Sequence, residues 1–248
     1  GFCLVGSEMC IRDRYRCFAS NEELEKIRQK SGSYLYPRIW RDRSQEEVDA
    51  KILNEDEHTI RMRIPSDGDI SFEDLVYGKI NTKCSELDDF IIARSDGSPT
   101  YNLTVVVDDN DMNISHVIRG EDHISNTPKQ MLIYKALGWT IPKFGHLPMI
   151  LGSDGKRLSK RHGAKGTGEY KDQGYLPDTL INYLALLGWN PGNGDEIFDF
   201  NYLQENFSLD KVNKKSAVFD TTKLEWVSSQ NIFKIPAAKL VDIVSEFD

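Results

Sequence analysis

The chain has 248 residues, which is enough for two domains or for one domain with a large insertion. Its composition, 39% hydrophobic and 28% charged, is typical of a soluble globular protein, and no run of about 20 apolar residues predicts a membrane span. The formal net charge of −8 argues against a protein that coats nucleic acid, although a local basic patch can still contact one RNA.

The N-terminal stretch, residues 1–14, fits nothing downstream, and its string LVGSEMCIRDR resembles a translated sequencing adaptor. We therefore interpret 1–14 as an artefactual tail and expect the natural protein to begin upstream of Tyr15. Ser20, with Glu23 three positions later, predicts a capping box and a helix that runs to about Lys30.

The next stretch, from Tyr34 to Asp49, mixes aromatic and basic residues and ends in a short acidic helix at 45–51. Such a mixture can stack on and clamp nucleotides, with Arg38 and Arg41 as candidates, or it can be ordinary packing beside a solvated face. Short strands or hairpins are predicted at 58–64, at 71–80 with an end at Gly78, and at 88–94.

The middle of the chain predicts alternating strands and helices. A turn at 95–100 leads through Tyr101 into a predicted buried strand at 103–107, and a second strand at 114–118 ends in Arg119-Gly-Glu-Asp-His123. A helix follows, with Thr127 as a capping residue, Pro128 in the first turn and Gly138 at its end. This order predicts one half of a doubly wound α/β sheet, in which ligands bind at the carboxyl ends of the strands.

A basic loop follows the segment 143–151. Five cations and no acid fall within ten positions, and glycines bracket the run. A mobile cationic loop suits a polyphosphate, although a solvated surface loop has the same composition. The five cations are Lys156, Arg157, Lys160, Arg161 and Lys165.

The remaining residues predict helices. The segment 174–189 is amphipathic, with apolar residues at 180, 181, 183, 184 and 187 and Gly188 as its C-cap. Further short helices are expected at 167–170, 199–206, 208–214 and 221–227, with a turn at 217–220.

The basic loop also carries a family likeness. Arg157-Leu158-Ser159-Lys160-Arg161 resembles the KMSKS signature of class I aminoacyl-tRNA synthetases, in the KLSKR-HG form of glutamyl-tRNA synthetases. Arg157 replaces the first lysine, which keeps the charge and alters the donor geometry. The string DFIIARSDGSPTYNLTVVVDD resembles the same family, and the likeness extends from about Tyr15 to Ser228.

The resemblance implies a fragment of a bacterial-type glutamyl-tRNA synthetase. Its fold would be the C-terminal half of a class I Rossmann-like catalytic domain at 96–166. An α+β connective insertion that grips the tRNA acceptor end would precede it at 15–95, and a helical stem-contact domain would follow at 167–248. The family's HIGH-type motif is absent from these residues, so we expect that this chain alone forms no adenylate.

The resemblance also implies the ligands and their residues. The substrates would be ATP with Mg²⁺, L-glutamate and tRNA(Glu). The protein would be a monomer and would not associate with a membrane. Arg119 would pair with the glutamate side-chain carboxylate, or else form a structural ion pair with Glu121 or Asp122. Tyr101 would bond the amine or carboxylate region, or be a core tyrosine. The remaining roles are catalytic for Lys160, Arg157 and Ser159, ATP-binding for Lys160, Asp122, His123, Met149, Ile150 and Leu151, and tRNA-binding for Arg161, Lys165, Arg38 and Arg41.

The implied chemistry proceeds in two steps, through a glutamyl-adenylate. Displacement at the α-phosphorus depends on positioning and charge stabilisation, so no covalent nucleophile is needed. His146 and His162 are expected to be structural rather than proton carriers. The alternatives are a glutaminyl-tRNA synthetase, the short tRNA-modifying paralogue of the glutamyl-queuosine type, and a non-catalytic tRNA-binding fragment. The helical segment 174–228 favours a synthetase over the short paralogue.

The four cysteines predict a reducing, cytoplasmic compartment, because they form no CxxC pair and are too sparse for a disulfide scaffold. Some bacterial relatives carry a second cysteine where Ala19 stands, as part of a zinc knuckle. We therefore expect no zinc here, and Cys17 is expected to be a buried structural thiol.

Overall fold

The computed structural model describes residues 13–159 and 166–245. Packing divides the chain into two compact units, each discontinuous in sequence. The first comprises Gly1–Glu73, Lys79–Val117 and His123–Phe144, and the second comprises Asp74–Gly78, Ile118–Asp122 and Gly145–Asp248. The domain boundaries expected from the sequence, at 15–95, 96–166 and 167–248, stay predictions.

A three-stranded antiparallel sheet begins the first unit, in the strand order β1-β2-β5. Its strands are β1 (Arg14–Cys17), β2 (Thr59–Met62) and β5 (Ile91–Ala93). Arg14, which the sequence analysis assigned to the artefactual tail, pairs with Met62 in this sheet. Cys17 is buried, as expected, and its Sγ lies 3.1 Å from the Tyr36 hydroxyl.

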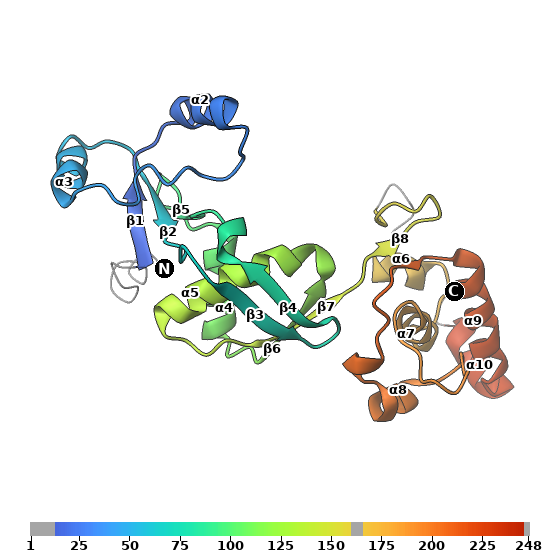
Figure 1. The fold of residues 1–248 in the computed structure, drawn as a ribbon. Coiled ribbons are helices and arrows are strands. Elements are labelled where there is room, and N and C mark those ends of the chain that lie inside the picture. Colours follow the sequence, from blue (N-terminus) through green and yellow to red (C-terminus); the bar gives the residue numbers. More distant parts are fainter. Residues whose placement is uncertain (1–12, 160–165, 246–248) are drawn as a thin grey trace. The chain divides into compact units, whose positions relative to one another are not determined.

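Two helices lie in the connection between β1 and β2 (Figure 1). They are α2 (Asn21–Ser31) and α3 (Gln45–Leu53). The predicted cap of α2 is confirmed, since the Ser20 hydroxyl accepts from the Glu23 amide at 3.1 Å. The complete reciprocal capping box forms instead at α3, between Ser44 and Glu47.

A four-stranded sheet in the order β4-β3-β7-β6 forms the framework for the site. Its strands are β3 (Asp69–Asp74), β4 (Gly78–Lys83), β6 (His116–Gly120) and β7 (Lys143–Leu147). The last residues of β3, β6 and β7 belong to the second unit. The hairpin β3–β4 was predicted, but Gly78 begins β4 rather than ending the hairpin.

Helices α4 (Tyr101–Asp111) and α5 (Thr127–Leu137) pack on each other in the first unit. The predicted strand at 103–107 is therefore wrong. A short apolar run fits a buried helix as well as a strand, and Leu103 and Val106, three apart, are the residues that α4 buries. For α5, Gly138 ends the helix as predicted, whereas Asn126 rather than Thr127 occupies the N-cap.

The second unit is mainly helical after β7. Its helices are α6 (Thr167–Asp172), α7 (Pro177–Leu186), α8 (Phe200–Asn206), α9 (Thr221–Phe233) and α10 (Ala237–Ser245), with a short 3-10 turn at Leu209–Lys211 between α8 and α9. Another 3-10 turn, Glu121–Asn126, follows β6. The pair α7 and α9 packs together, and Tyr183, Leu224 and Val227 are buried between them. None of the described helices is long and apolar enough to cross a membrane.

Three expectations in this region are wrong in detail. The helix expected at 208–214 is only a 3-10 turn at Leu209–Lys211. The segment expected to be a turn at 217–220 contains the strand β9 (Ala217–Val218), which pairs in parallel with β8 (Ile150–Leu151). Helix α7 is shorter than predicted, with Leu187 rather than Gly188 as its C-cap. Leu184 is exposed, whereas the polar Asn182 is fully buried and bonds the backbone of Glu196 and Phe198.

Candidate functional site

The cationic loop begins as a tight hairpin. Leu151 forms an antiparallel bridge with Arg157, and the Leu158 amide donates to the Ile150 carbonyl at 2.8 Å. Gly155, with φ +74°, makes the turn. The hairpin presents Arg157, whose Nη1 lies 2.9 Å from Asp122 Oδ2. The predicted catalytic Ser159 follows directly, while Lys160, Arg161, His162 and Lys165 lie outside the described residues.

Arg119 contacts a buried histidine. Its Nε donates to His146 Nε2 at 3.2 Å, and His146 Nδ1 lies 2.6 Å from Asp74 Oδ2. The side chains of His146 and Asp74 are both 0% exposed. Sequence reasoning treated His146 as structural and missed Asp74, which no local pattern singles out because its partners are distant in sequence.

Asp74 is saturated with hydrogen bonds. Its Oδ1 accepts from the amides of Val76 and Tyr77, each at 2.9 Å, and from the His146 amide at 3.3 Å. Burial alone would raise the pKa of this carboxyl, but the bonds from Tyr77, His146 and Val76 outweigh it and lower the pKa. The group is therefore a carboxylate at neutral pH.

Glu121 ties the end of β6 to the segment that precedes the hairpin. Its carboxylate accepts from the Tyr77 hydroxyl at 2.5 Å and from the Met149 amide at 3.0 Å. Burial, together with Glu121, raises the pKa of Tyr77. Met149 and Ile150, two of the three residues expected beside adenine, line an apolar cavity of about 250 Å³, and the Leu151 carbonyl accepts from Phe219.

Tyr101 and His123, both in the first unit, lie together. The Tyr101 hydroxyl is 3.3 Å from His123 Nδ1, and the ring centroids are 5.9 Å apart. Tyr101 is 48% exposed, so it is not a core tyrosine. The residues Arg119 and Asp122 belong to the other unit.

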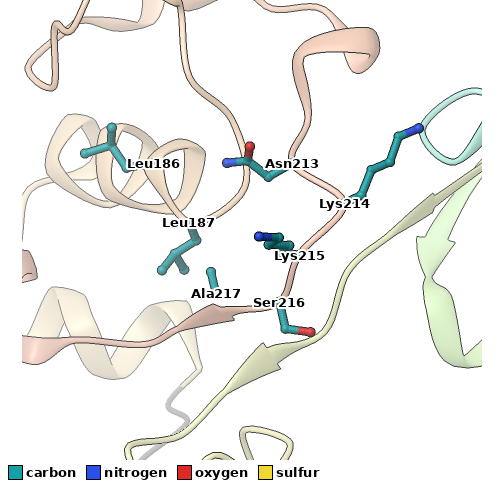
Figure 2. Close-up of a pocket in the computed structure, with 7 residues that line it drawn as sticks. All are labelled: Leu186, Leu187, Asn213, Lys214, Lys215, Ser216 and Ala217. Atoms are coloured by element: carbon teal, nitrogen blue, oxygen red, sulfur yellow. The ribbon is translucent and has the colours of Figure 1, made fainter.

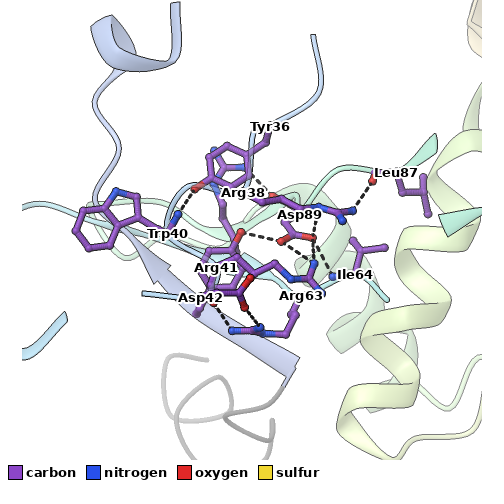
Figure 3. Close-up of polar contacts among 11 residues, drawn as sticks. Tyr36, Arg38, Trp40, Arg41, Asp42, Arg63, Ile64, Leu87 and Asp89 are labelled. Atoms are coloured by element: carbon purple, nitrogen blue, oxygen red, sulfur yellow. Dashed lines mark hydrogen bonds and ion pairs between the residues drawn. The ribbon is translucent and has the colours of Figure 1, made fainter. Parts of the chain in front are cut away.

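The two arginines expected to bind tRNA surround Asp89, whose side chain is 0% exposed (Figure 3). Arg41 Nη1 contacts both carboxylate oxygens, at 2.9 and 3.1 Å, and Arg38 lies 3.5 Å away. The Tyr15 hydroxyl and the Ile64 amide also donate to this carboxylate. Arg41 thus neutralises a buried charge, a structural role that the sequence did not reveal, and tRNA binding by either arginine stays a prediction.

A cavity of about 560 Å³ in the second unit lies between the end of α7 and the segment 213–217 (Figure 2). Lys214 and Lys215 are among its lining residues, and Lys214 Nζ also donates to the Tyr77 carbonyl at 3.4 Å. Among the described residues, no group of three or more His, Cys, Asp or Glu side chains could hold a metal ion.

Comparison with known proteins identifies the family. Residues 12–226 match the family described as "tRNA synthetases class I (E and Q), catalytic domain". The glutamate–tRNA ligase of Nitrosospira multiformis is 47% identical over 237 residues, covering 94% of this chain and 50% of that protein. That of Nitrosomonas europaea is 48% identical, with the same coverage. The chain spans about half the length of the curated relatives it matches.

A solved structure supports the same family assignment. The glutamate tRNA ligase from Elizabethkingia meningosepticum, in complex with its amino acid, aligns with a TM-score of 0.80 and 31% identity, covering 94% of this chain and 51% of that one. This likeness confirms the predicted fold class, part of a class I α/β catalytic domain. The chain belongs to the catalytic domain family of the class I tRNA synthetases for E and Q.

Proposed function

We propose that the protein carrying this chain attaches glutamate to tRNA(Glu) through a glutamyl-adenylate, with the magnesium complex of ATP as co-substrate, in the cytoplasm and as a monomer. The observation that carries the proposal is Arg119, held at the end of β6 by a buried histidine. The matched relatives are named glutamate–tRNA ligases, which supports the same substrate.

Arg119 recognises the amino acid. A guanidinium is planar and always charged, and the fork formed by its two terminal nitrogens matches a carboxylate. We assign the glutamate side-chain carboxylate to this fork, whose plane is fixed by the bond from Nε to His146. Tyr101, half-exposed beside His123, bonds the amine or carboxylate region.

ATP is held by the hairpin and the end of β6. The glutamate α-carboxylate attacks the α-phosphorus, and the departing pyrophosphate carries the charge that Lys160, Arg157 and Ser159 stabilise. Asp122 and His123 contact the ribose or adenine side, and the segment 149–151 runs beside the adenine. Arg157 must exchange Asp122 for phosphate oxygens in this step. The Arg157 side chain is 67% exposed, so breaking its ion pair with Asp122 costs little free energy.

tRNA contacts come from Arg161 and Lys165, with Arg38 and Arg41 as further candidates. The 248-residue polypeptide itself forms no adenylate, because no HIGH-type turn is present in its sequence. ATP–pyrophosphate exchange above background by this polypeptide would overturn that statement. If the chain acts only as an RNA-binding module, filter binding will show salt-dependent acceptor-stem affinity without exchange.

The experiment that tests the whole proposal uses the full-length protein that contains this chain. It is expected to charge tRNA(Glu) with glutamate and to reject glutamine, and Arg119→Gln is expected to raise the glutamate KM strongly while leaving the ATP KM near its original value. Preferential charging with glutamine would instead establish the glutaminyl alternative.

A further inference from the structure

Three side chains lie in a line across the four-stranded sheet. Asp74 ends β3, His146 lies in β7 and Arg119 lies in β6, and these strands are neighbours in that order. The hydrogen bonds follow the same order, 2.6 Å from Asp74 to His146 and 3.2 Å from His146 to Arg119. All three residues belong to the second unit.

The contacts determine which imidazole nitrogen carries the proton. An arginine only donates hydrogen bonds, so His146 Nε2, which receives the Arg119 Nε–H, must be unprotonated. The proton of the neutral ring is then on Nδ1, where Asp74 Oδ2 accepts it. A doubly protonated ring would turn a donor toward the guanidinium and break the contact.

Asp74 has no freedom to present its carboxylate differently. Three backbone amides, those of Val76, Tyr77 and His146, fix Oδ1. Only Oδ2 faces the imidazole, and both side chains are fully buried. The turn after β3 therefore holds the Asp74 carboxylate in place, and this carboxylate selects the Nδ1–H tautomer of His146. In that tautomer, Nε2 accepts from Arg119 and fixes the guanidinium.

We propose that Asp74 and His146 are positioning residues for amino-acid recognition, which fix the Arg119 guanidinium through the Nδ1–H tautomer of His146. This inference rests on the proposed role of Arg119 in binding the glutamate side chain. Because Nε is held, the planar terminal fork of Arg119 points in one direction. The entropic cost of ordering this long side chain therefore arises when the protein folds and not when glutamate binds.

Isosteric substitutions separate positioning from packing. In Asp74→Asn, the three backbone amides retain the side-chain oxygen, and the new NH₂ donates to Nδ1 and forces the proton onto Nε2, which then opposes Arg119. His146→Asn keeps a donor for Asp74 and removes the acceptor for Arg119. His146→Gln places an amide oxygen near the former Nε2 and retains the acceptor.

The assay is tRNA charging by the full-length protein, with KM for glutamate and for ATP, kcat and Tm measured for each variant. Asp74→Asn and His146→Asn are expected to raise the glutamate KM about tenfold or more, because a hydrogen bond to a charged group is worth about one order of magnitude in affinity. The ATP KM is expected to stay within about twofold, and His146→Gln to recover most of the glutamate affinity.

Three results would overturn the inference. One is an unchanged glutamate KM in Asp74→Asn and His146→Asn, and another is an equal rise in both KM values with no rescue by His146→Gln. The third needs no variant: ¹⁵N NMR of the wild-type imidazole that finds the proton on Nε2. Arg119→Gln in the same assay tests the proposed function separately, because an unchanged glutamate KM there refutes the role of Arg119 itself.

Discussion

Asp89 allows a sharp stability prediction. In Asp89→Asn the carboxylate charge that faces Arg41 is lost, although the side chain keeps its shape. Arg41, only 11% exposed, would then be a largely buried cation without its anionic partner, and the Tyr15 hydroxyl would lose its charged acceptor. Removing one partner of a buried ion pair costs about 3–5 kcal/mol, and we expect a loss in that range.

The matched control is Asp42→Asn. Asp42 also accepts from an arginine, Arg63 Nη1 at 2.9 Å, but its side chain is 79% exposed. Exposed pairs contribute about 0–1 kcal/mol, so this variant is expected to be nearly neutral. The two substitutions change the same atoms, at sites that differ in burial and in the number of donors around the carboxylate.

The measurement is urea unfolding of wild type and both variants, followed by far-UV circular dichroism. The midpoint is expected to fall clearly for Asp89→Asn and hardly at all for Asp42→Asn, at similar m-values. Equal shifts in the two variants, or a loss below about 1 kcal/mol for Asp89→Asn, would refute the reasoning that burial makes this pair costly to break.

Three further outcomes are expected. Gly120→Ala places a Cβ 2.5 Å from Asp122 Oδ1, so Asp122 must move, and the ATP KM of the full-length protein should rise severalfold while the glutamate KM changes less. The pKa of Asp74 lies below its ordinary value of 3.8, so the stability that its carboxylate contributes is present above that value and is lost as the pH falls through the folded-state pKa. The free energies of unfolding of wild type and Asp74→Asn, measured against pH, should therefore converge at low pH. Glu121→Gln keeps one acceptor where two donors converge, and should lower Tm by a few degrees and loosen the backbone at Met149, measured by amide hydrogen exchange.

Local chemistry was predictable from the sequence. Ser20 and Gly138 mark helix ends through bonds and backbone angles that form within a few residues, and both were found. The strand prediction at 103–107 was wrong for the opposite reason, because the valines of this run favour a strand locally and only tertiary packing makes it a helix. The α/β fold class was still predicted correctly, because that prediction rested on the family resemblance and not on the periodicity of this run.

The polar centres could not be predicted. Asp89 meets Arg41 from 48 positions away, and Asp74 meets His146 from 72. Each is an acidic residue beside apolar ones, and no local pattern singles it out. Strand order brings Asp74 to His146, and the path of two loops brings Arg41 to Asp89. No spacing rule for helices or strands encodes either meeting. Sequence reasoning accordingly assigned Arg41 to RNA and left Asp74 without a role.

The two buried carboxylates use arginine in opposite ways. Asp89 contacts Arg41 directly, so the carboxylate offsets the charge of that guanidinium at close range. Asp74 reaches Arg119 only through a neutral imidazole, which orients the guanidinium without placing a negative charge against it. Coulomb attraction falls with distance, so Asp74 offsets the charge of Arg119 less across the interposed ring than it would in direct contact. A histidine between the two charges is therefore suited to an arginine that binds an anion, as direct contact is suited to one that holds a fold together.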